Sequence, residues 1–114
     1  MHLPDDLPIL TFESAAALRA WLAAQHASSA GMWLRIYKKR AGVRSVTFEE
    51  VLDEGLCFGW SESARRGYDA DSYLQRFTPR KVCGTTSARN LTRAKALIEA
   101  GKMRPAGLAA LGLE

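Results

Sequence analysis

Two segments with the pattern of β-strands, residues 60–66 and 72–78, are separated by only five residues, and this spacing constrains the fold more than any other feature. A connection this short can join antiparallel neighbours, but it is too short for the crossover that parallel strands require. The turn contains Gly67 and Asp69, and Pro79 stops the second strand because proline has no amide hydrogen to donate to a neighbour. The sequence therefore predicts a β-hairpin.

Residues 47–59 carry both a start signal and a stop signal for a helix. Thr47 and Glu50 have the spacing of a capping box, in which the hydroxyl accepts from the amide three residues on and the carboxylate reaches back to the cap amide. Apolar residues then recur at helical spacing, and Gly59 fits the end of the helix. Other helices are expected from Ser14 to residues 25–29, from Ser87 to Ala100, and after Pro105.

Residues 32–39 predict a further strand, because aromatic and branched residues alternate along them. The alternation places Met32, Leu34 and Ile36 on one face, and Trp33, Arg35 and Tyr37 on the other. Helices and strands are intermixed, so we expect one α+β domain over residues 1–114. It should contain a small, mainly antiparallel sheet, with three to four helices packed on one side. Residues 1–8 are expected to form a flexible N-terminus.

Composition narrows the class of protein. A chain of 114 residues, 47% hydrophobic and 25% charged, is typical of one compact globular domain. The sequence contains no run of apolar residues long enough for a membrane span and no secretory signal pattern, which predicts a cytoplasmic protein. Cys57 and Cys83 lack metal-binding spacing and the chain has only two histidines, so we expect no metal and no cofactor.

Two sequence blocks resemble those of the YdeI/OmpD-associated family, also described as bacteriocin-protection proteins. The blocks are Leu-Cys-Phe-Gly-Trp at residues 56–60 and Arg-Phe-Thr-Pro-Arg at residues 76–80. The similarity continues through Asn90 and residues 101–108, and it extends back to Phe12. The resemblance implies a small cytoplasmic bacterial protein, loosely linked to envelope stress and antimicrobial-peptide resistance, with no established reaction or cofactor.

The chain departs from that family's pattern in two places. After Trp60 the family usually continues Ile-Asp-Gly, whereas this chain has Ser61, Glu62 and Ser63, so a carboxylate is kept with one extra methylene. Thr86 stands where relatives commonly have a tryptophan. A ligand that stacked on that tryptophan in relatives would lose this contact here.

The residues of these blocks make our first candidate site, a pocket for an anionic small molecule or an acidic protein surface. Glu62 and Arg76 are equally distant from a turn centred near Asp69, so we expect them to face one another across the hairpin. Arginine side chains and the amides at the start of the helix after Ser87 would bind the anion. The predicted ligand-binding residues are Glu62, Arg76, Arg80, Lys81, Ser87 and Asn90. The simpler interpretation is a surface salt bridge between Glu62 and Arg76.

A nucleic-acid-binding module is the alternative, and it would use Trp33, Arg35 and Tyr37. Aromatic residues interleaved with cations can stack on bases and follow a phosphate backbone. Between residues 33 and 93 there are twelve basic and seven acidic residues, an excess larger than the net charge of +4 of the whole chain. Acidic residues of the helix after Thr47 interrupt this positive field, however, and the simpler interpretation places Trp33 and Tyr37 half-buried under a helix.

A hydrolase is the third interpretation. A serine, threonine or cysteine nucleophile needs an adjacent base. The two histidines are His2 and His26, and the candidate nucleophiles are Ser61, Ser63, Ser87 and Cys83. No spacing in the sequence connects either histidine to one of these candidates. Cys57 has the surroundings of a small core residue. The sequence therefore favours a non-catalytic binding protein.

Overall fold

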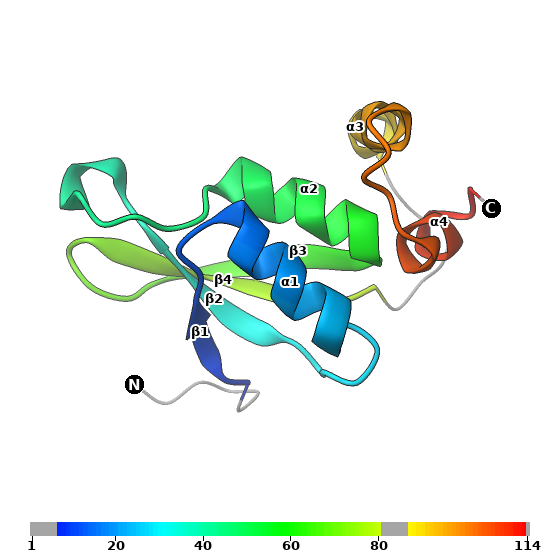
Figure 1. Ribbon diagram of the computed structural model, residues 1–114. Helices are drawn as coiled ribbons and strands as arrows, with labels where there is room; N and C mark the ends of the chain where they lie inside the picture. The colour runs from blue at the N-terminus through cyan, green and yellow to red at the C-terminus, as the bar shows by residue number, and fades with distance from the viewer. Residues whose placement is uncertain (1–6, 81–86, 114) are drawn as a thin grey trace.

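The computed structural model describes residues 7–80 and 87–113, and this part of the chain forms four strands, four α-helices and one short 3-10 helix (Figure 1). In chain order they are β1 (Ile9–Thr11), α1 (Ala15–Gln25), β2 (Met32–Tyr37), η1 (Lys39–Ala41), α2 (Phe48–Phe58), β3 (Trp60–Gly67), β4 (Ser72–Pro79), α3 (Ala88–Glu99) and α4 (Pro105–Leu111). The strands lie in the order β1-β2-β4-β3. β1 pairs with β2 in parallel, and the other pairings are antiparallel, so the predicted α+β class with a mainly antiparallel sheet is confirmed.

The main core lies between the sheet and two helices, α1 and α2, which cover one face of it (Figure 1). Leu34 of β2 and Phe77 of β4 meet Leu18 of α1 and Val51 of α2 there, and all four are fully buried. α3 and α4 pack on α2. Burial of this apolar face is the main favourable contribution to folding.

The opposite face of the sheet has a small core of its own. Trp33 and Leu74 are buried there, and Leu7 packs against them in place of the helix that we expected. The amide of Trp33 donates to the carbonyl of Pro8 at 2.8 Å. Residues 7 and 8, which we expected to belong to a flexible N-terminus, are therefore held against the sheet, while residues 1–6 lie outside the described residues.

The helix ends follow the signals in the sequence. A side-chain oxygen accepts a 3.2 Å hydrogen bond from the amide three residues on at the N-caps Ser14, Thr47 and Ser87. The Glu50 carboxylate accepts from the Thr47 amide, which completes the predicted capping box. α2 ends at Gly59, whose φ of +77° favours glycine, and a Cβ there would lie 2.8 Å from the carbonyl oxygen of Ala106.

The hairpin contains a β-bulge that the sequence did not predict. It lies between residues 62 and 65 of β3. The buried side chain of Gln75, on the neighbouring strand, donates from Nε2 to the carbonyls of Ser63 and Ala64 at 3.3 and 3.1 Å. Arg65 Nε donates to Gln75 Oε1 at 3.4 Å. One buried amide therefore satisfies the backbone of the bulge.

Candidate functional site

Glu62 and Arg76 of the predicted anion pocket lie on opposite faces of the sheet. Glu62 pairs with Phe77 on the helix-covered face, whereas Arg76 pairs with Trp33 on the other face. The expectation that they face one another is wrong for a geometric reason. Gly67 pairs with Tyr73, so the turn is centred on residue 70 instead of 69, which alone would move the partner of Glu62 from residue 76 to residue 78 and keep it on the same face. The bulge then moves the partner back by one residue, to Phe77. A change of one residue in register moves a side chain to the opposite face.

The other predicted members have local roles or fall outside the description. Arg80 follows β4, and its amide donates to the carbonyl of Gly59 at 2.9 Å. Ser87 is the N-cap of α3, and its hydroxyl accepts from the amide of Asn90, so helix capping accounts for this contact. Lys81 lies outside the described residues. None of the described members lines either of the two cavities presented below.

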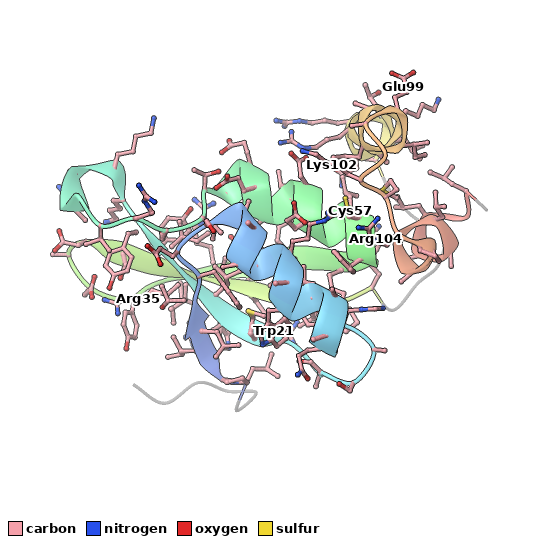
Figure 2. All side chains as sticks on the ribbon, in the orientation of Figure 1. Trp21, Arg35, Cys57, Glu99, Lys102 and Arg104 are labelled. Carbon is pink, nitrogen blue, oxygen red and sulfur yellow. The ribbon has the colours of Figure 1, made fainter. Side chains whose placement is uncertain are left out.

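Arg35 is the centre of a polar cluster at the end of the sheet (Figure 2). Its Nε donates to Ser72 Oγ at 2.9 Å, and its Nη2 donates to Asp69 Oδ2 at 2.6 Å. The guanidinium carbon lies 4.5 Å from the ring centroid of Tyr37 and 4.9 Å from that of Tyr68. The hydrogen bond from Ser72, helped by the charge of Arg35, lowers the pKa of Asp69. The cluster ties β2 to the hairpin turn.

These contacts bear on the surface that the sequence suggested for nucleic acid. Trp33 is only 2% exposed and cannot stack on a base. Arg35 stacks on the protein's own tyrosines. Of the three residues, Tyr37 alone borders a described cavity. The three side chains therefore do not form the shared platform that we predicted.

The described residues show no activated nucleophile of the kind that a hydrolase needs. The Ser72 hydroxyl donates to Asp69 Oδ1 at 2.8 Å, but Ser72 is 1% exposed and a carboxylate with a lowered pKa is a weak base. Burial raises the pKa of the Cys57 thiol, which keeps it protonated and unreactive. His26 Nδ1 lies 2.8 Å from the carbonyl oxygen of Leu22. Nor do the described residues include a cluster of three or more metal-ligating side chains.

A groove lies where the end of β2 and η1 meet the first turn of α2. Its volume is about 450 Å³, within the range of small-molecule sites. Its lining includes the cations Lys38, Lys39 and Arg44 and the aromatic residues Tyr37, Phe48 and Tyr73. We call it the basic groove.

The charge in the basic groove is not balanced. The side chains of Lys38, Lys39 and Arg44 are exposed, and none of them forms a salt bridge with another described residue. Glu49 is the one acidic residue in its lining, all of which is described. A fourth cation, Arg65, adds to the charge, because its guanidinium lies over the rings of Tyr73 and Phe48. The groove therefore combines positive charge with aromatic walls.

Sequence reasoning found the cations of this groove but not the groove. Lys38, Lys39 and Arg44 follow Tyr37 in the sequence and are among the twelve basic residues counted between residues 33 and 93. Phe48 and Tyr73 come from other elements, and Tyr73 reaches this place because it pairs with Ile36 across β2 and β4. That register was not evident in the sequence.

The fold and this groove define a small α+β domain with a candidate ligand site. The family described as a domain of unknown function (DUF8412) matches residues 10–110, so the chain belongs to that family. No curated protein and no solved structure matches the chain. No helix within residues 7–80 and 87–113 has the length and apolar character needed to cross a membrane. The resemblance to YdeI/OmpD-associated proteins stays a prediction.

Proposed function

We propose that the protein is a non-catalytic binding domain, and that the basic groove takes a small anionic ligand with an apolar or aromatic part. One observation carries the proposal: Lys38, Lys39 and Arg44 gather around a cavity of about 450 Å³ without a salt-bridge partner among the described residues. The class of ligand is still the small anion predicted from the sequence, but its site lies at the other end of β4.

Both parts of such a ligand would gain from the groove. Each exposed cation is worth roughly 0.5–1 kcal/mol to a bound anion, so three of them give about 1.5–3 kcal/mol at low salt. Val43 lines the groove and is 49% exposed, so a ligand that covered it would also remove apolar surface from water. These contributions favour a phosphate or carboxylate that carries a ring over a bare inorganic ion.

The test is a titration of the protein with phenyl phosphate at low ionic strength, followed by backbone amide NMR signals. The signals of residues 36–49 should shift. The double variant Lys39→Gln/Arg44→Gln should bind about 5- to 30-fold more weakly, which corresponds to the loss of two cations. A matched control, Lys95→Gln/Lys102→Gln, removes two exposed charges outside the groove and should change the affinity by less than about twofold.

Two results would overturn the proposal. Phenyl phosphate that leaves the groove signals unchanged would show that there is no site. A control variant that loses as much affinity as the groove variant would show general charge attraction instead of a site. Inorganic phosphate is the second titrant, and if it bound as tightly as phenyl phosphate, the apolar part of the proposal would be wrong.

The other expectations stay predictions. They are a cytoplasmic location and a role in envelope stress, which the resemblance implies, and nucleic acid as the alternative ligand. An oligonucleotide that bound the basic groove with an affinity falling steeply as salt rises would favour the nucleic-acid alternative.

A further inference from the structure

A second cavity lies between α1, the last residue of α2 and α4, at the other end of the molecule from Arg35 (Figure 2). Its volume is about 360 Å³, and it is lined by Ala23, His26, Phe58, Arg104, Pro105 and Ala106. We call it the α4 pocket. Most of its wall is apolar, and two nitrogen-bearing side chains, His26 and Arg104, supply the polar groups.

The walls of the α4 pocket are held in place by close backbone contacts. A Cβ at Gly107 would lie 2.4 Å from the carbonyl oxygens of Leu56 and Cys57, so α4 touches the end of α2 directly. The amide of Arg104 donates to the carbonyl of Cys57 at 3.0 Å. Phe58, at the pocket wall, is buried. A pocket with fixed walls can bind a ligand without the entropy cost of ordering its own side chains and backbone.

Arg104 is the polar group of the pocket that is suited to an anion. The side chain of Arg104 is exposed and has no ion-pair partner among the described residues. His26 Nδ1 must carry a hydrogen, because its neighbour at 2.8 Å is the carbonyl oxygen of Leu22, which can only accept. In the neutral ring Nε2 is then an acceptor, which can take a hydrogen bond from water or a hydroxyl but cannot donate one to an anion. The lining contains no acidic residue, and every lining residue is described.

The ring of Phe58 supplies an apolar wall of the pocket and adds no charge. The guanidinium of Arg19 lies 5.3 Å from its centroid, and the ring of His26 lies 5.4 Å away at 51°. Arg19 is itself paired with Glu54, so it adds no unbalanced charge. Arg104 is then the one permanent cation of the pocket lining, and it matches one negative charge.

We propose that the α4 pocket binds a small monocarboxylate with an aromatic or aliphatic body. The body lies against Phe58, Ala23 and Pro105, and the carboxylate accepts hydrogen bonds from the Arg104 guanidinium. The cavity is near the lower limit of ligand-site volumes, which restricts the body to about one ring. This site is separate from the basic groove and does not depend on the function proposed for that groove.

The experiment compares three probes by NMR titration of the whole chain: benzoate, benzyl alcohol and acetate. Benzoate should shift the amide signals of residues 23–26 and 104–106, and it should bind at least about fivefold more tightly than either benzyl alcohol, which lacks the charge, or acetate, which lacks the ring. Arg104→Gln should weaken benzoate binding by about fivefold or more, whereas Lys95→Gln should change it by less than about twofold.

A second variant distinguishes the loss of the Arg104 contact from an indirect effect of Arg104→Gln on the structure of α4. Ala23 is an exposed helix position, so Ala23→Leu should leave the fold intact, fill the pocket and abolish the benzoate-induced shifts of residues 24–26 and 104–106. In the groove variant Lys39→Gln/Arg44→Gln, benzoate should shift the signals of residues 23–26 and 104–106 as it does in the wild type. The proposal is overturned if benzyl alcohol shifts these signals at the same concentration as benzoate, if Arg104→Gln leaves their titration unchanged, or if they still shift in Ala23→Leu.

Discussion

Arg19 connects three parts of the molecule, so replacing it should have a large and specific effect on stability. Its Nη1 donates to Glu54 Oε1 of α2 at 2.8 Å, and its Nη2 donates to the carbonyl of Lys102, in the α3–α4 connection, at 2.5 Å. Its guanidinium also lies over the ring of Phe58. Glu54 is only 7% exposed, so water cannot fully replace the arginine.

The expected cost of Arg19→Met follows from these contacts. Removing one partner of a buried ion pair costs about 3–5 kcal/mol, because the other charge stays buried and unpaired. The Arg19 side chain is 23% exposed, so some water reaches the pair and we expect roughly 2–4 kcal/mol. At about 4 °C per kcal/mol for a domain of this size, the melting temperature should fall by roughly 8–16 °C.

Urea denaturation of a double-mutant cycle is the assay. Arg19→Met combined with Glu54→Leu should be about 1–3 kcal/mol more stable than Arg19→Met alone, because the double variant no longer buries a carboxylate. Arg66→Met, at an exposed position of β3, is the control and should cost less than about 0.5 kcal/mol. The reasoning fails if Arg19→Met costs no more than the control, or if the two substitutions simply add.

Three further predictions follow from the packing. Gly107→Ala should lower the free energy of unfolding in urea by about 2–3 kcal/mol, because the added Cβ meets two carbonyl oxygens. Gly101→Ala is the control: its φ is +73° and its Cβ would lie in open space, so it should cost only about 1 kcal/mol of backbone strain. Equal costs would contradict the close contact of α4. Gln75→Leu should cost roughly 1–3 kcal/mol, since it removes the donor to two carbonyls of the bulge, and unchanged stability would show that water replaces the amide. The hydrogen bond from Ser72 lowers the pKa of Asp69, so the ionised carboxylate stabilises the fold above about pH 4 and this contribution is lost as the pH falls through the lower pKa of the folded state. The difference in melting temperature between the wild type and Asp69→Asn, followed by circular dichroism, should therefore be largest above about pH 5 and should shrink as the pH falls below that, and a difference independent of pH would refute this account.

The sequence predicted those parts of the fold that depend on neighbouring residues. Ser14, Thr47 and Gly59 mark helix ends through contacts within a few residues, and alternation along β2 identified its two faces correctly. The hairpin register could not be predicted in the same way, because the bulge depends on Gln75, a residue of the other strand.

The candidate site was harder to predict for the same reason. Both cavities are formed by elements that are distant in the sequence: Tyr73 and Phe48 both line the basic groove, and Arg104 and His26 both line the α4 pocket. Neither residue type nor local spacing shows which distant elements line the same cavity. The sequence identified the positive charge near Tyr37 but could not show that the charge surrounds a cavity.

The bulge has a consequence for how this protein behaves beside other copies of itself. β3 is an outermost strand, and an outermost strand with regular backbone spacing invites a neighbouring chain to continue the sheet. Here the spacing is interrupted between residues 62 and 65, and two exposed arginines, Arg65 and Arg66, follow directly. An incoming strand would meet a bent backbone and repelling cations, so the irregularity that Gln75 maintains also protects the hairpin against edge-to-edge aggregation.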